Sequence, residues 1–185
     1  MSYEFAGGYK IRDQSGIHFL TFTIVGWIDL FSRQRYRDII LESFAFCRKN
    51  KGLQIGAFVI MSNHLHVIWT ATNGNLSDII RDFKTHTSKA MFESILKEPE
   101  SRKEWLEYMF RFFSNKTAAN ENFKIWSGDS HPEAIYTSEF LMSKLNYIHE
   151  NPVRAGIVAD AVQYLYSSAG IYAGEKGLIE IDLLY

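Results

Sequence analysis

Two histidines stand two residues apart inside an apolar, strand-forming run that extends from Val59 to Trp69. Side chains of a strand alternate between its two faces, so His64 and His66 share one face while Leu65 points to the other. Imidazole nitrogens are common ligands of divalent metal ions, and a strand is a rigid support for two of them. The spacing therefore predicts a metal site at the surface of a sheet.

A second motif lies on a helix that we expect near the other end of the chain. Thr137 or Ser138 can cap the first free amides of this helix. The helix is predicted to end near Asn151, because Pro152 disfavours helical geometry in the residue before it and Gly156 follows.

This helix has an apolar stripe and a neighbouring polar one. The side chains that would face the core recur at intervals of four and three residues: Leu141, Leu145 and Ile148. Lys144, Tyr147 and Asn151 lie within about 60° of one another at roughly 100° per residue. One short arc of the helix therefore presents a cation, a phenol and a carboxamide.

In this order, the two motifs resemble those of the tyrosine transposases of the HUH single-strand endonuclease group, in particular the REP-associated tyrosine transposases related to the smallest insertion-sequence transposases. HUH stands for His, hydrophobic residue, His, which residues 64–66 match. The sequence around the family's nucleophilic tyrosine is similar to residues 147–156 here. The resemblance covers most of the chain, with further similar segments at Phe19–Thr23, Asn75–Lys84 and Tyr166–Ala169.

The resemblance implies an activity and a set of roles. Tyr147 would attack single-stranded DNA beside a hairpin, take the 5′ phosphate and release a 3′ hydroxyl. His64 and His66 would supply two metal ligands, and Asn151 would supply the third. Mg²⁺ or Mn²⁺ is favoured over Zn²⁺, because the site lacks thiolates and must leave positions open for phosphate oxygens.

A tyrosine nucleophile suits strand transfer for a chemical reason. The phosphotyrosine ester keeps the bond energy that hydrolysis would dissipate, so a 3′ hydroxyl can later reverse the reaction without ATP. A phenol is a weak nucleophile at neutral pH, so a metal ion or a base must assist it.

Bulk properties indicate one domain, residues 1–185, in a reducing compartment. The single cysteine, Cys47, excludes an internal disulfide. The N-terminal residues lack a basic stretch followed by an apolar one, and the longest apolar run, Ala57–Met61, is too short to cross a bilayer. We expect a cytoplasmic location and no membrane partner.

Charge gives partial support to a DNA partner. The formal net charge is −1, unlike the strongly basic balance of many DNA-binding proteins. Residues 1–92 hold 11 Lys and Arg against 7 Asp and Glu, whereas residues 93–185 hold 9 against 14. The histidine pair lies in the positive half. The candidate DNA-contacting residues are Arg81, Lys84, Lys144 and Arg154.

The hydrophobic pattern predicts an α+β fold. Strands are expected at 17–25, 54–61 and 64–70, and helices at 35–49 and 75–96. This strand, helix, strand, strand, helix order begins a ferredoxin-like antiparallel sheet with helices packed on one face, which the resemblance also implies. A further helix follows Ser101, residues 128–136 form a connection, and residues 179–185 alternate as a C-terminal strand.

The leading hypothesis is a metal-dependent single-stranded DNA endonuclease and strand transferase. The chief alternative is a domesticated relative that binds nucleic acid and regulates expression without cutting it. A hydrolase of small phosphoesters is less favoured, because no carboxylate-rich cluster for two metals is visible. The sequence leaves open whether the chain acts as a monomer or as a homodimer.

Overall fold

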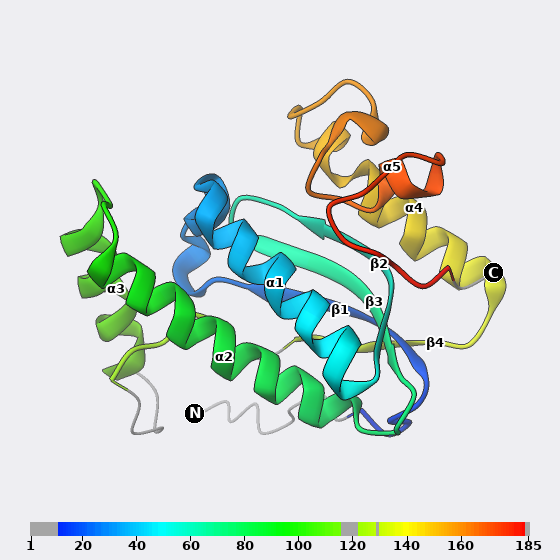
Figure 1. Ribbon diagram of the computed structural model, residues 1–185, viewed down its shortest axis with the longest axis horizontal. Coiled ribbons are helices and arrows are strands. Elements are labelled where there is room, and N and C mark those ends of the chain that lie inside the picture. Colours follow the sequence, from blue (N-terminus) through cyan, green and yellow to red (C-terminus); the bar gives the residue numbers. More distant parts are fainter. Residues whose placement is uncertain (1–10, 116–121, 129, 184–185) are drawn as a thin grey trace, which may run out of the picture.

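The computed structural model describes residues 11–115, 122–128 and 130–183, which form an α+β fold around one antiparallel sheet (Figure 1). Its strands are β1 (Ile17–Thr23), β2 (Leu53–Ile60), β3 (His64–Ala71) and β4 (Glu133–Ile135). They lie in the order β2-β3-β1-β4, and every neighbouring pair is antiparallel. This order is the ferredoxin-like arrangement that the sequence predicted.

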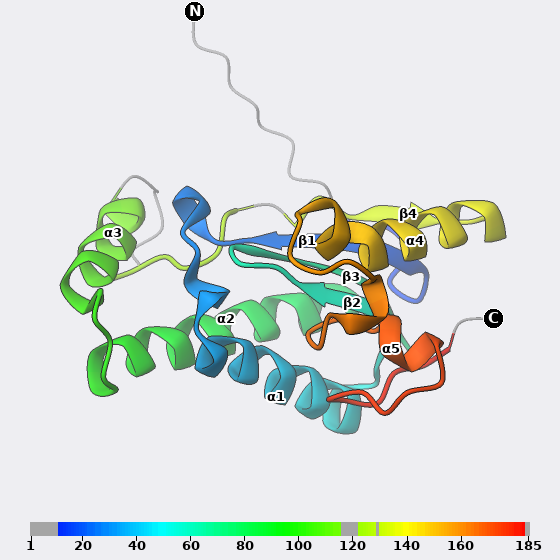
Figure 2. The same cartoon turned by 90° about the horizontal axis from the view of Figure 1, so that it is seen from above.

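The helices occupy both faces of the sheet (Figure 2). They are α1 (Gln34–Lys51), α2 (Leu76–Lys97), α3 (Lys103–Asn115), α4 (Ser138–Arg154) and the short α5 (Ala169–Tyr172). As expected, α1 and α2 pack together on one face. In addition to the predicted single layer of helices, α4 lies on the opposite face, where it contacts β2 and β3. None of the helices within the described residues is long and apolar enough to cross a bilayer.

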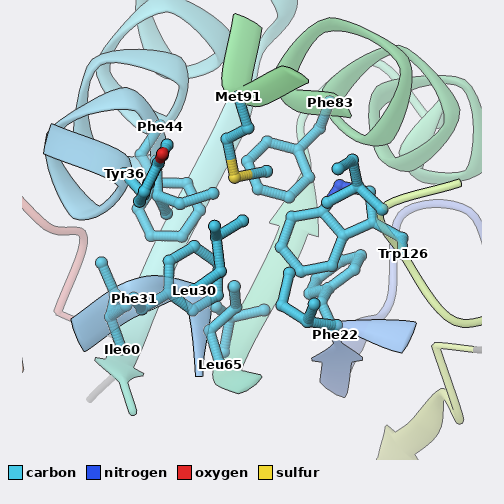
Figure 3. Close-up of a cluster of buried hydrophobic side chains, with 14 of the residues drawn as sticks. Phe22, Leu30, Phe31, Tyr36, Phe44, Ile60, Leu65, Phe83, Met91 and Trp126 are labelled. Atoms are coloured by element: carbon cyan, nitrogen blue, oxygen red, sulfur yellow. The ribbon is translucent and has the colours of Figure 1, made fainter. Parts of the chain in front are cut away.

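The main core lies between the sheet and the α1–α2 layer, where aromatic rings interlock (Figure 3). Phe22, Phe44 and Phe83 are almost completely buried there, and Trp69 packs among them from β3. A smaller apolar cluster joins the other face to α4 through residues such as Phe19, Ile68, Leu145 and Ile148. Burial on both faces fixes the register of β3, because a slip of one residue would exchange its two sets of side chains.

Proline 152 lies inside α4, which is a correction to the predicted end of that helix near Asn151. Thr137 caps the start as predicted, since its hydroxyl accepts a hydrogen bond from the amide of Phe140 at 3.2 Å. Pro152 is tolerated because it lies in the last turn, where its missing N–H removes only one helical bond, and because its ring is buried. The helix continues to Arg154.

Two other predictions need correction. Strand β4 lies within the segment expected to be a connection, where three residues pair with β1. The described residues 179–183 form no strand, although Asp182 binds β2 through both its backbone amide and its carboxylate, which contact Ile55. Contact with one residue of β2 is too little to form a ladder of backbone hydrogen bonds. The alternating pattern therefore wrongly predicted a strand among the described residues 179–183. Residues 184–185 lie outside the described part of the chain.

The helix predicted after Ser101 is present as α3, and several of its aromatic residues point outward. Trp105, Tyr108 and Phe112 are exposed, whereas Leu106 and Phe110 are buried. The helix itself was predicted correctly. Which of its faces contacts α2 depends on tertiary packing.

Candidate active site

The two histidines lie side by side at the start of β3 on the face that α4 covers. His66 is opposite Thr21 of β1, and His64 is opposite Thr23. Leu65 points to the other face and belongs to the main core, as strand alternation predicted. The imidazole ring centroids of His64 and His66 are 4.8 Å apart. The strand therefore presents two imidazole nitrogen ligands close together on one face of the sheet.

Hydrogen bonds orient both imidazole rings. Nδ1 of His64 lies 2.7 Å from Oδ1 of Asn63, and Nδ1 of His66 lies 2.8 Å from the hydroxyl of Thr21. The amide oxygen of Asn63 can only accept, so Nδ1 of His64 carries the proton. The Thr21 hydroxyl can accept in the same way from His66. Nε2 of each ring is then left with the lone pair that a metal ion needs.

Burial keeps both imidazoles neutral. It lowers the pKa of His64 below its ordinary value. Burial, with smaller contributions from the neighbouring His64, Lys144 and Arg154, lowers the pKa of His66 to about 3. Since a protonated imidazole cannot bind a metal ion, the environment holds this pair in the ligating form at neutral pH.

Tyr147 projects from the middle of α4 toward the histidine pair. Its ring centroid is 5.1 Å from that of His66 and 5.9 Å from that of Phe19 on β1. Leu145 and Ile148 on the same helix are buried against the sheet. The neighbouring polar stripe of the helix, which carries Tyr147, therefore faces the histidines. Tyr147 remains 39% exposed, so an external substrate can reach its phenol.

Two cations border this tyrosine. The guanidinium of Arg154 lies 4.6 Å from the ring centroid of Tyr147, and its Nη2 donates to the backbone oxygen of Tyr147 at 2.8 Å. Nζ of Lys144 lies 4.3 Å from the centroid of Phe19 and pairs with Glu133 of β4 at 2.7 Å. Arg154 therefore places a positive charge beside the phenol, which suits a substrate that carries phosphate, while Lys144 is paired with Glu133.

Arg81 and Lys84, the other two basic candidates, lie on α2 and so on the opposite side of the sheet from the histidine pair. Arg81 pairs with Asp78 and Asp82, and Nζ of Lys84 donates to the backbone oxygens of Ser127 and Gly128. The structure brings Lys144 and Arg154 to the tyrosine and leaves Arg81 and Lys84 apart from it.

The two neutral imidazoles are nitrogen donors of a kind that a divalent metal ion would accept. Within residues 11–115, 122–128 and 130–183, no group of three His, Cys, Asp or Glu side chains could hold a metal. Asn151, the third ligand that the resemblance implies, lies one helical turn after Tyr147 on α4. Its carboxamide oxygen is a ligand that Mg²⁺ and Mn²⁺ accept.

His149, on the same helix, is held away from this chemistry by its contacts with Ser168 and Tyr172. Its Nε2 lies 2.8 Å from the hydroxyl of Ser168, and its ring contacts that of Tyr172 at 5.1 Å between centroids. Burial lowers its pKa to about 4, so it is neutral at pH 7. Its role is to join α4 to the segment before α5.

Sequence reasoning missed the residues that orient the site. Thr21 and Phe19 alternate with core residues on β1, and nothing in the sequence alone pairs Thr21 with His66 across the sheet. Asn63 lies between the two strands predicted at 54–61 and 64–70, where a turn residue needs no further role. Its position directly before His64 was the one available signal, because adjacent polar side chains at a turn often bond to each other.

Replacing Asn63 by alanine is expected to weaken metal binding by about 10- to 100-fold, because the ring of His64 loses the acceptor that sets its tautomer and orientation. Thr21→Val, which keeps the shape of the side chain, should have a similar effect through His66. Calorimetric titration with Mn²⁺ measures both. Asn50→Ala on α1 is the matched control, since Asn50 bonds only to its own helix at Phe46. Unchanged affinity in both site variants would contradict these roles.

The fold and the site together define a class of protein: a ferredoxin-like sheet that presents a histidine pair to a helix-borne tyrosine beside two cations. The Transposase IS200-like family model matches residues 27–125, which is more than half of the chain. The chain belongs to the IS200-like transposase family, and so to a family of enzymes that act on DNA. The matched residues include the histidine pair and end before Tyr147.

Solved structures resemble this fold at low sequence identity. A REP-associated tyrosine transposase bound to a REP hairpin is 16% identical, with a TM-score of 0.64 over 97% of this chain and 94% of that one. A putative transposase from Deinococcus radiodurans is also 16% identical, with a TM-score of 0.42 over 82% of this chain and 97% of that one. A search of curated protein sequences found no match.

Proposed function

We propose that the protein is a metal-dependent single-stranded DNA endonuclease and strand transferase that uses Tyr147 as its nucleophile. The observation that carries this proposal is the 5.1 Å separation between the ring centroids of Tyr147 and His66, two residues that lie far apart in the sequence. Membership of the IS200-like transposase family supports it. The proximity of His66 and Tyr147 corresponds to the His-hydrophobic-His motif and the tyrosine of the HUH endonucleases.

The reaction follows from what a phosphodiester requires. The phenol oxygen of Tyr147 attacks phosphorus, a new P–O bond forms, and the bond to the 3′ oxygen of the preceding nucleotide breaks. The phenol gives up its proton and the departing 3′ oxygen gains one. The 5′ phosphate then stays on Tyr147 until a 3′ hydroxyl reverses the step.

The chain's own charges assist at two places. Arg154, against the Tyr147 ring, can neutralise a phosphate oxygen as negative charge develops, and Lys144 can do so from the other side of Phe19. His64, His66 and Asn151 would hold Mg²⁺ or Mn²⁺. Such an ion supplies further positive charge for the phosphate oxygens when it is bound.

The substrate we propose is a DNA hairpin with a single-stranded flank. A REP hairpin is the ligand of the structurally similar transposase, which is the reason for this choice of DNA. The ring of Tyr147 packs against Phe19 and His66 on the sheet, so the reacting phosphodiester must come close to the sheet surface beside α4. An unpaired strand can bend into such a site more easily than a stiff duplex.

A labelled hairpin oligonucleotide with a single-stranded flank is expected to be cut in the presence of Mg²⁺ or Mn²⁺. The same oligonucleotide should resist cutting when a complementary strand pairs the flank, because a paired flank cannot unstack into the site. Denaturing gel electrophoresis measures both reactions. Equal cutting of the fully paired substrate would overturn the proposed specificity. Tight binding of the hairpin without any cutting would favour the alternative, a regulator that binds nucleic acid and does not cut it.

A further inference from the structure

Trp27 is a large apolar side chain left in solvent beside the histidine pair. It lies in the turn after β1, in a short 3₁₀ segment (Val25–Trp27), and its side chain is 69% exposed. Its ring centroid is 6.2 Å from that of His64, with the planes inclined by 66°. The edge of the candidate metal site therefore carries an open indole face.

The backbone that carries Trp27 is held in a conformation that few side chains adopt. The φ angle of Trp27 is +55°, and that of Gly26 before it is +64°. A Cβ on Gly26 would lie 2.6 Å from the ring of Phe113 on α3, so only glycine fits there. A bulky residue with positive φ is strained. Because the indole is exposed, its packing does not offset the cost of that strain.

The same amide that orients His64 also holds this turn. Nδ2 of Asn63 donates to the backbone oxygen of Trp27 at 3.3 Å, while Oδ1 of Asn63 accepts from Nδ1 of His64. Backbone bonds from the Ile24 amide to Asn63 and from the Val25 amide to Ile125 fix the rest of the turn. The indole is thus positioned relative to the imidazole by one shared side chain.

We propose that Trp27 is a stacking platform for one unpaired DNA base next to the scissile phosphate, and so a positioning residue for cleavage. The proposal rests on the proposed function, because it assumes that the phosphate lies between the histidine pair and Tyr147. A base attached to a neighbouring nucleotide then reaches the rim of the site, where the indole is the aromatic surface adjacent to His64. Aromatic side chains bind unpaired bases by stacking, with little dependence on base identity.

A single-stranded flank explains the exposure better than an apolar protein partner does. The indole stands beside a polar, cation-bordered site, and its ring lies next to the imidazole of His64. A nucleotide offers both a flat face for the ring and a phosphate for the site. Stacking also requires a rigid ring, which the fixed turn supplies.

The test measures binding in a Tyr147→Phe background, so that cleavage does not interfere. Hairpin oligonucleotides carry a single-stranded flank in which each nucleotide in turn is made abasic, which removes a base and keeps the phosphate charge. Trp27→Ala is expected to weaken binding of the intact flank by about 10-fold or more, whereas Trp27→Phe should stay within about 3-fold, since a phenyl ring still stacks. Trp105→Ala on α3 is the matched control, because Trp105 is also an exposed indole.

One abasic position should reproduce the loss seen in Trp27→Ala and cause no further loss in that variant. This lack of additivity identifies the stacked base, because each change removes the same contact. If every abasic position weakens Trp27→Ala as much as it weakens the parent protein, the proposed stacking does not occur. Circular dichroism melting verifies that each variant is folded.

Fluorescence gives a readout that does not depend on affinity. The chain has four tryptophans, of which Trp69 and Trp126 are buried, so a Trp105→Phe background leaves Trp27 as the exposed indole. Saturating hairpin with its flank should quench this emission, and the hairpin with the critical abasic site should not. Cleavage of DNA by the Trp105→Phe protein without a change in its Trp27 emission would overturn the stacking proposal alone. Failure of the wild-type protein to bind or cut any of the DNA would overturn the proposed function, and the stacking proposal with it.

Discussion

Replacing Tyr147 by phenylalanine is expected to abolish DNA cleavage, with a loss of about a thousand-fold or more, while hairpin binding changes by no more than a few-fold. The substitution removes the oxygen that would attack phosphorus and keeps the ring that contacts Phe19 and His66. Because Tyr147 is 39% exposed, little packing is lost. The variant should therefore fold normally and bind its substrate.

The decisive measurement is the covalent adduct. A hairpin oligonucleotide labelled at its 3′ end should migrate with the denatured wild-type protein, since the 5′ phosphate of the labelled fragment would remain on the tyrosine. Tyr147→Phe should give no such band. Tyr108→Phe on α3 is a matched control, because it removes an exposed phenol from a different helix. An adduct that persists in Tyr147→Phe would assign the nucleophile to another residue.

Replacing either His64 or His66 by alanine is expected to eliminate metal binding and cleavage together. Each substitution removes one of two imidazoles whose Nδ1 atoms are already engaged and whose Nε2 atoms are left to bind the ion. We expect the affinity for Mn²⁺ to fall by more than about 100-fold, as measured by calorimetry. Asn151→Ala should be milder, and raised Mn²⁺ should partly restore its activity.

The control for this pair is His86→Ala, which removes an exposed imidazole from α2 on the other side of the sheet. It should bind Mn²⁺ and cut DNA as the wild-type protein does. Calorimetry that finds the same metal affinity in the wild-type protein and in both histidine variants would place the metal elsewhere. Loss of cleavage with full metal binding would assign the histidines a role other than ligation.

The local periodicities of the sequence determined most of the fold. The strands around His64 and the helices at α1 and α2 were predicted within a few residues, because buried residues must recur with the period of the element that carries them. The shared face of His64 and His66 follows from the same rule, since strand alternation needs no tertiary information. Motif order was enough to select Tyr147 among ten tyrosines.

Contacts between distant segments were decided only by the tertiary structure. Thr21 and His66 lie opposite each other because of the register of β1 against β3, and Tyr147 reaches His66 because Leu145 and Ile148 anchor α4 on that face of the sheet. Charge alone did not distinguish Arg81 from Arg154, whereas the structure places Arg81 on α2, on the other side of the sheet from Tyr147. The position of Trp27 depends on Asn63 and on the close packing of Gly26 against Phe113. Sequence periods specify which face of an element is buried, whereas the partner of that face depends on how all the elements pack into one structure.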